Sequence, residues 1–269
     1  MATILSNLEM KTPDRQASVH PGQLFKYDAP GVTFRQRFLH NQANLLFLNC
    51  GEYLVPPDTE SALSSLPDRE SLLWMWKGTL EAEVNGQVFQ LDSYDTLYIP
   101  KGAAYRLRNR SGEPACAIQT SAPAKNVHPV FHSRFAEFSK REERIRRLHQ
   151  KIVYLMFDVT ESADKLIAGY TFYDARTRAW PPHNHTDQEE TYIFIKGHGS
   201  MEVYETPEKM TFVHNVNEGD LVTIPFLNYH PVFSQDEPLQ FIWCIAGERY
   251  WVGDKNKDFM KGNGEAITT

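Results

Sequence analysis

The sequence predicts an all-β protein in which two antiparallel β-barrels of the jelly-roll type follow each other along the chain. Three observations lead to this prediction. Most apolar residues fall in short runs that end at turn residues, the two halves repeat the same short motifs, and 269 residues suffice for two domains of roughly 130 residues each. We expect the first barrel in 1–130 and the second in 131–269, with the joint between them inside 122–150.

The strands are predicted from runs of branched and aromatic residues bounded by turn residues. Many short strands at close spacing favour an antiparallel sandwich or barrel. Asn85 and Gly86 predict a tight hairpin turn because both residues tolerate a positive φ. The charged run at 139–150 is interpreted as a short amphipathic helix packed on a barrel, with a solvated connector as the alternative. The predicted strands are 43–50, 79–86, 96–100, 166–174, 191–197, 201–205, 220–225 and 239–247.

The two halves repeat each other in motif and order, which indicates two homologous domains. Trp-Lys-Gly at 76–78 corresponds to Ile-Lys-Gly at 195–197, and the Asp-to-Pro segment at 95–100 corresponds to the one at 220–225. The glycine and the proline of these motifs are 22 residues apart in the first half and 28 in the second. The extra length predicts a longer hairpin around 204–215.

Composition excludes several classes of partner. A net charge of −6 gives no general attraction to nucleic acid or to an anionic membrane, and no run approaches the roughly 18 apolar residues of a membrane span. The N-terminus lacks the apolar region of a secretory signal. Cys50, Cys116 and Cys244 are far apart in apolar runs, which favours buried reduced thiols over disulfides. We therefore expect a cytoplasmic protein.

The clearest functional signal is a set of metal-ligand residues in the second half. His183 and His185 are separated by one residue, so on a strand both side chains project from one face. Glu190 begins the next strand-like run, and His230 follows the strand at 220–225. Three imidazoles and one carboxylate suit a borderline divalent metal, and the set leaves coordination positions open. We expect one metal per chain, zinc first, with manganese, iron or nickel as alternatives.

The spacing of these residues matches the two cupin motifs. The first motif runs His-x-His, three or four residues, Glu, six residues, Gly, and here His183, His185, Glu190 and Gly197 fill it. The second runs Gly, five residues, Pro, and then His five residues after the proline. Gly219, Pro225 and His230 fill it. The complete set in this order predicts a metal site inside the second barrel.

The first half serves as an internal control. Positions counted from its own glycine and proline place Ser64, Leu66, Ser71 and Tyr105 where the second half has its ligands. None of the four is a metal ligand of the expected kind, and a shift of one residue would add only the single carboxylate of Glu70. We expect the first barrel to be metal-free and to act as core, lid or subunit contact.

At this point the chain resembles the bicupin sugar-acid isomerases, the family of 5-keto-4-deoxyuronate isomerase and 5-deoxy-glucuronate isomerase. Segment 95–106 is similar to that family's N-terminal barrel, 183–195 to its metal strand and 240–248 to its last barrel strand. The resemblance implies a bicupin fold, zinc at His183, His185, Glu190 and His230, and a homo-oligomer. The gap from His185 to Glu190 is closer to the first enzyme, whereas segments 180–183 and 229–231 are closer to the second.

A ketol isomerase moves a proton from the carbon beside a carbonyl, so a residue besides the ligands must handle the proton. Glu190 is expected to act in catalysis as a ligand, and Tyr192 is the first candidate for a polar helper because strand alternation gives it the same face. A barrel-lining role for Tyr192 is the alternative. Alternation turns Glu189 away. The candidate cations for a substrate carboxylate are Arg176, Arg178, Lys196 and Arg249.

Three functions remain open from the sequence. The first is a metal-dependent ketol isomerase acting on a deoxy-uronate or related sugar acid. The second is another metallo-cupin enzyme, a dioxygenase or a hydrolase, whose ligands would be the same. The third is a non-catalytic sugar-binding cupin, since a fold alone does not define a function. No dinucleotide fingerprint is visible, so hydride transfer is not expected. In each case the expected partner is a small molecule.

Overall fold

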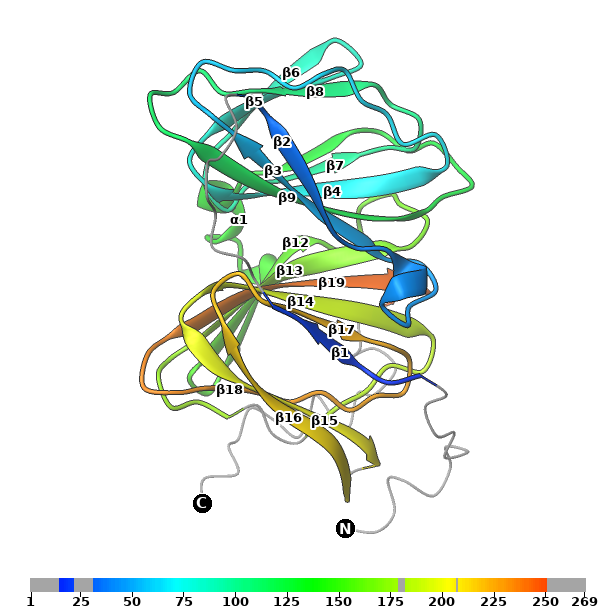
Figure 1. Cartoon of the computed structure of the whole chain (residues 1–269), viewed down its shortest axis with the longest axis vertical. Helices are drawn as coiled ribbons and strands as arrows, with labels where there is room; N and C mark the ends of the chain where they lie inside the picture. Colours follow the sequence, from blue (N-terminus) through cyan, green and yellow to red (C-terminus); the bar gives the residue numbers. More distant parts are fainter. Residues whose placement is uncertain (1–14, 22–30, 179–181, 207, 251–269) are drawn as a thin grey trace.

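Antiparallel β-sheets form almost all of the regular structure, which confirms the predicted all-β class (Figure 1). The computed structural model describes residues 15–21, 31–178, 182–206 and 208–250. Within these ranges the helical segments are α1 (Phe135–Phe138) and two 3-10 turns at His40–Gln42 and Glu142–Arg144. No helix in the described ranges is long and apolar enough to cross a membrane.

The first half of the chain supplies most of two sheets. The larger has the strand order β10-β7-β4-β9-β3-β2, and the smaller has the order β6-β5-β8. Asn85 and Gly86, with φ of 49° and 82°, make the predicted hairpin turn between β5 and β6. The strands are β2 (Thr33–Phe38), β3 (Asn49–Val55), β4 (Arg69–Lys77), β5 (Leu80–Val84), β6 (Gln87–Leu91), β7 (Thr96–Ile99), β8 (Tyr105–Arg108), β9 (Ala115–Pro123) and β10 (Phe131–Ser133).

The second half repeats this arrangement. Its larger sheet has the order β1-β17-β14-β19-β13-β12-β11, and its smaller sheet has the order β16-β15-β18. The long hairpin expected around 204–215 is β15 and β16. The strands are β1 (Ser18–His20), β11 (Ile145–Leu148), β12 (Lys151–Phe157), β13 (Leu166–Tyr173), β14 (Gln188–Lys196), β15 (His198–Thr206), β16 (Lys209–Asn217), β17 (Leu221–Ile224), β18 (Val232–Ser234) and β19 (Leu239–Gly247).

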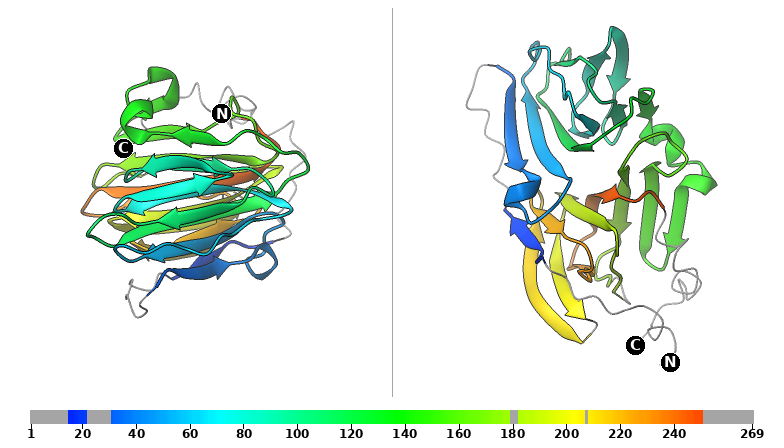
Figure 2. Two further views of the ribbon diagram at one scale, coloured as in Figure 1. Left: turned by 90° about the horizontal axis from the view of Figure 1, so that it is seen from above. Right: turned by 90° about the vertical axis from the view of Figure 1, so that its right-hand side faces the viewer.

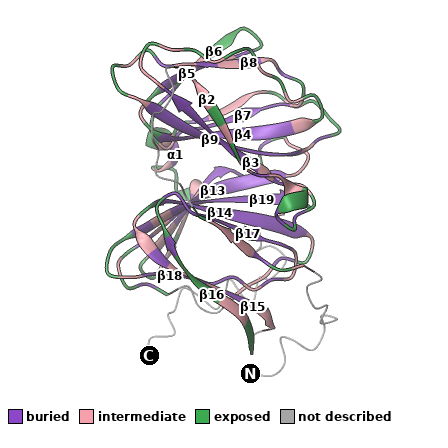
Figure 3. Ribbon diagram, viewed as in Figure 1, coloured by how far each residue is buried: buried purple, intermediate pink, exposed green. Residues whose placement is uncertain are grey.

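The two halves are stacked so that their larger sheets face each other (Figures 1 and 2). One apolar core fills the space between these sheets and contains residues of both halves. Within it the ring of Trp74 meets that of Tyr170 edge to face at 5.4 Å, and Trp76 Nε1 donates to the carbonyl of Ile195 at 3.0 Å. The burial colours show the same layer as a buried band across the middle of the molecule (Figure 3). Each half also has its own interior core between its two sheets.

The motif repeat in the sequence corresponds to a repeat in backbone conformation. Gly78 after β4 and Gly197 after β14 have φ of 76° and 79°, which only glycine adopts at little cost. A Cβ atom at these positions would lie 2.9 Å from the carbonyl oxygen of Pro114 and 2.2 Å from that of Pro238. In each half, the segment that leads into β9 or β19 passes so close to this glycine that a side chain would not fit.

Two strands pair across the expected division at residue 130. β1, from the start of the chain, pairs with β17 in the second half, and β10, after residue 130, pairs with β7 in the first. The large sheet of each half is thus completed by a strand from the other side of the division. The boundary between 1–130 and 131–269 stays a proposal. Because β1 and β10 each pair with a strand of the other half, cutting the chain at this boundary would remove one strand from each large sheet.

Two local predictions were wrong. The strand expected at 43–50 begins only at Asn49, because Asn44 has φ of 58° and the amides of Leu46 to Leu48 bind the carboxylate of Glu189 instead of a strand. The helix expected at 139–150 is a 3-10 turn followed by β11, whose residues pair with β12. The prediction of buried thiols is confirmed, since all three cysteines are buried and none forms a disulfide.

Candidate metal centre

The four residues predicted as ligands come together inside the second barrel. His183 and His185 lie in the connection between β13 and β14, Glu190 lies on β14, and His230 lies between β17 and β18. Hydrogen bonds join the two connections: His230 N donates to the carbonyl of His183 at 3.2 Å, and Leu227 N donates to that of His185 at 2.7 Å. The backbone therefore fixes three imidazoles around the start of β14.

The donor atoms form a compact group. One nitrogen from each histidine and one oxygen of Glu190 all lie within 4.8 Å of one another. Glu190 Oε2 is 3.1 Å from His185 Nε2 and 3.0 Å from His230 Nε2. The ring centroids of His183 and His230 are 4.5 Å apart. His185, Glu190 and His230 are buried, and His183 is partly buried.

The electrostatics keep Glu190 and His183 in the forms that bind a metal. Burial by itself would raise the pKa of Glu190, but the adjacent imidazoles of His185 and His230 outweigh burial and lower the pKa to about 2. Burial, followed by repulsion from His230, His185 and Lys151, holds the pKa of His183 well below its ordinary value. An ionised carboxylate and a neutral imidazole are the ligand states that coordination requires.

An orphaned buried atom supports the fit of a cation. His230 Nδ1 lies 2.7 Å from the carbonyl of Asn228, so Nδ1 carries the proton and Nε2 presents a lone pair. That Nε2 is buried, 3.0 Å from the carboxylate, and makes no hydrogen bond with any described residue. Two acceptors at this distance repel each other unless a cation lies between them. The donor set suits zinc, manganese, iron or nickel.

The first half fills the corresponding place with neutral groups. Tyr105, the counterpart of His230, shares a hydrogen bond with Tyr53 at 2.8 Å between the hydroxyl oxygens. Gln119 Nε2 donates to Ser71 Oγ at 3.2 Å and lies 3.1 Å from the Tyr105 hydroxyl oxygen. Ser71, the counterpart of Glu190, thus belongs to a network of hydroxyl and amide groups that satisfies itself. A metal-free first barrel stays a prediction, and this network is consistent with it.

Adjacent residues on β14 have different surroundings. Tyr192 shares the ligand face, with its ring 5.7 Å from that of His230. Burial, followed by the charges of Glu190 and Tyr173, raises its pKa well above the ordinary value, so the phenol is neutral. Glu189 points the other way, as predicted, and accepts hydrogen bonds from the amides of Leu46, Phe47 and Leu48 at 2.6 to 2.8 Å. A catalytic role for Tyr192 stays a prediction.

The four cations named from the sequence have other surroundings. The guanidinium of Arg249 donates to the carbonyls of Asp158, Ala163 and Leu166. Arg178 lies 3.7 Å from a carboxylate oxygen of Glu202 and over the ring of Phe233. Lys196 is exposed at the end of β14, and Arg176 lies in a turn with φ of 59°.

One cation that was not predicted from the sequence, Lys151, faces this interior. Lys151 begins β12, where Lys151, Val153 and Leu155 share a strand face and the latter two belong to the interior core. Its Nζ lies 5.3 Å from the ring centroid of Tyr173, another interior residue. The signal in the sequence was the alternation within 151–157, which the charged run directly before it concealed.

Fold and site together define a protein of the cupin class, with two barrels in tandem and a His/Glu centre in the second. The chain belongs to the KduI/IolB family, whose model matches residues 43–261. This is a family of isomerases, so the expectation drawn from the resemblance is confirmed at the level of family. No curated protein sequence matches the chain significantly.

Solved structures support the fold. An IolB-like protein from Salmonella typhimurium has a TM-score of 0.71 and 16% identity, covering 87% of this chain and 94% of its own. A variant of oxalate decarboxylase from Bacillus subtilis has a TM-score of 0.69 and 15% identity, with 91% and 81% covered. Procruciferin, an 11S globulin from Brassica napus, has a TM-score of 0.68 and 11% identity, with 87% and 85% covered. At these identities the likeness concerns the fold alone.

Proposed function

We propose that this protein is a metal-dependent ketol isomerase that acts on a deoxy-uronate or a related sugar acid. The observation that carries the proposal is the buried group of His183, His185, Glu190 and His230 in a chain of the KduI/IolB family. The proposed cofactor is one divalent metal per chain, with zinc as the first candidate. Isomerisation requires no net change of oxidation state and no organic cofactor.

The side chains of the site have separable tasks. Glu190 and the three histidines would hold the metal, which when bound supplies Lewis-acid stabilisation of negative charge on substrate oxygens. Tyr192 is neutral and close to His230, so its hydroxyl can donate a hydrogen bond or a proton to a substrate oxygen. The buried rings of Phe241 and Trp243 line the same interior and exclude water. The proposal assigns no residue as the base that removes the proton from the carbon beside the carbonyl.

The test is proton NMR of 5-keto-4-deoxyuronate and of 5-deoxy-glucuronate, each incubated anaerobically with the metal-loaded protein. We expect one of them to give a new isomer, and chelation to abolish the activity until zinc or manganese is restored. Loss of the metal should remove several kcal/mol of transition-state stabilisation, the usual size of a Lewis-acid contribution. Elemental analysis should find about one metal per chain, and none after replacement of His183 and His185 by alanine.

Other outcomes would change the assignment. Metal at wild-type stoichiometry in the double alanine variant would contradict the ligand set. No isomer from either compound, together with oxygen consumption on another substrate, would favour the dioxygenase alternative. Sugar binding without any turnover would favour a non-catalytic cupin. Deuterium uptake from solvent at the carbon beside the carbonyl would support proton transfer through an exchangeable group.

A further inference from the structure

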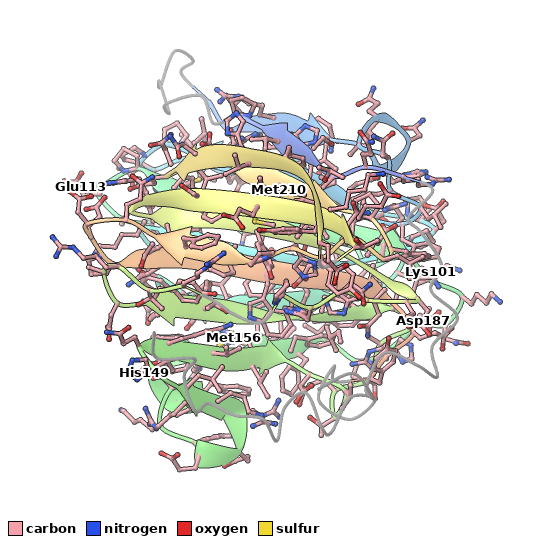
Figure 4. All side chains as sticks on the ribbon, turned by 90° about the horizontal axis from the view of Figure 1, so that it is seen from below. Lys101, Glu113, His149, Met156, Asp187 and Met210 are labelled. Carbon is pink, nitrogen blue, oxygen red and sulfur yellow. The ribbon has the colours of Figure 1, made fainter. Side chains whose placement is uncertain are left out.

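We infer that Lys151 is the residue that binds the carboxylate of the substrate and so makes the site specific for sugar acids. The inference rests on the proposed function and adds the substrate class and the residue that recognises it. In the view from below, His149 marks the turn that leads into β12, and Lys151 is the first residue of that strand (Figure 4).

The strand register places Lys151 on the interior face. It pairs with Tyr173 of β13, whose ring lies beneath its ammonium group. A row of aromatic rings then leads from Tyr173 to the candidate metal centre. The ring centroid of Tyr173 lies 5.7 Å from that of Phe241, and the centroid of Phe241 lies 4.6 Å from that of Tyr192. The centroid of Tyr192 lies 5.7 Å from that of His230. Lys151 therefore belongs to the same lining as the ligands and not to the outer surface.

Charge links Lys151 to the centre. The negative charge of the Glu190 carboxylate acts on the ammonium group of Lys151. Burial lowers the pKa of Lys151 to about 8, partly offset by Glu190, so the ammonium form still dominates at neutral pH. A partly buried cation is costly unless an anion accompanies it. The side chain of Lys151 forms no ion pair or hydrogen bond with the residues that the structure describes.

The carboxylate of Glu190 does not serve as the anion for Lys151, and Arg146 does not replace Lys151 as the interior cation. Glu190, the carboxylate that acts on Lys151, already contacts His185 and His230. Arg146 of β11 lies on the same strand face as Val153, but its guanidinium is directed to the carbonyls of Glu143 and Ile145. A substrate with a carboxylate at one end and carbonyl and hydroxyl oxygens at the other would supply an anion to Lys151 while its oxygens lie at the centre.

The test compares an acid with its neutral ester. Isothermal titration would measure binding of glucuronate and of its methyl ester to metal-loaded wild-type protein, the Lys151→Met variant and a Lys196→Met control. Lys196 is exposed on the ligand strand, so the control makes the same charge change outside the interior. We expect wild type and control to prefer the acid by about 10- to 100-fold, the worth of one charge-assisted contact. Lys151→Met should lose this preference, with its metal content unchanged.

Kinetics on the isomerised compound separate recognition from proton transfer. Lys151→Met should raise KM with a smaller effect on kcat, and Lys151→Arg should restore part of the preference for the acid. A preference for the acid that persists in Lys151→Met overturns the inference, as does the absence of any preference in wild type. A collapse of kcat at unchanged KM and unchanged preference would make Lys151 a proton-transfer group and overturns it too. Absence of isomerisation with the preference present and dependent on Lys151 would contradict only the proposed function.

Discussion

Glu189 and Glu190 are consecutive buried carboxylates on one strand, and alternation gives them opposite tasks. Glu190 lies between two imidazoles in the interior of the second barrel. Glu189 lies on the other face and binds three backbone amides of the first half. The same chemical group thus serves the candidate metal centre at one position and the contact between the halves at the next.

Replacing Glu190 by glutamine should strongly weaken metal binding while the fold persists. The amide keeps the shape but loses the negative charge that offsets a divalent cation, so we expect metal affinity to fall on the order of 100-fold or more, beyond the usual effect of an outer-shell change. Competition with a chromophoric chelator would measure this affinity. Glu189→Gln, the neighbouring control, should bind metal as wild type does. Equal loss in both variants would indicate a general disturbance of β14 and contradict the assignment.

The ligands could be predicted from the sequence because their spacing is local. His183, His185 and Glu190 fall within a short segment, and His230 has a fixed distance from Pro225. Lys151 could not be found in this way, since it reaches the site through the pairing of β12 with β13 and no motif surrounds it. Arg249 was a plausible cation from sequence, but its actual partners are carbonyls that only the folded chain brings near it.

At the scale of elements, two carboxylates bind the halves together in a reciprocal way. Glu70 at the start of β4 accepts hydrogen bonds from the amides of Asp164, Lys165 and Leu166, just before and at the start of β13, at 2.7 to 3.1 Å. Glu189 of β14 does the same for Leu46 to Leu48, just before β3. Each half thus uses one carboxylate to satisfy the backbone of the other where no strand partner is present.

Glu189→Gln should therefore destabilise the protein by about 1–3 kcal/mol, because the single carbonyl oxygen of glutamine cannot satisfy three backbone amides and its NH₂ group opposes them. Glu70→Gln should have a similar effect. Glu218→Gln is the control: its pair with Lys77 also joins the halves, but both side chains are about half exposed, so we expect less than about 1 kcal/mol. Urea unfolding would measure all three. A loss for Glu218→Gln as large as that for Glu189→Gln would refute the distinction.

These hydrogen bonds between a carboxylate of one half and backbone amides of the other also explain why some elements were predicted poorly from the sequence. The stretch 43–48 has strand composition, yet its amides bind a side chain that is distant in sequence, so composition alone could not reveal its conformation. The run 139–150 has helix-like charge, but its last residues gain more from pairing with β12. Strands such as β13 and β19 were predicted well, because continuous apolar runs bounded by turns leave little alternative.

At the scale of the whole molecule, the internal repeat predicted the two-barrel architecture but not the core and the strands that the two halves share. The central core mixes side chains of both halves, such as Trp74 with Tyr170, and Trp76 with the backbone of Ile195. β1 completes the large sheet of the second half, and β10 completes that of the first. Separating the halves would expose one face of each large sheet and leave two strand edges unpaired.

We therefore expect the full chain to unfold in one cooperative transition. Calorimetry should show a single peak in which the calorimetric and van't Hoff enthalpies agree, and Glu189→Gln should shift the whole peak instead of splitting it. The segment 131–269 produced alone lacks β1 and the first half's share of the core, so it should show no cooperative unfolding, with or without added zinc. Metal binding should raise the Tm of the full chain, because it stabilises only the folded state. Two resolved peaks, or a cooperative transition in the isolated segment, would show instead that each barrel is stable by itself and that the shared core contributes little.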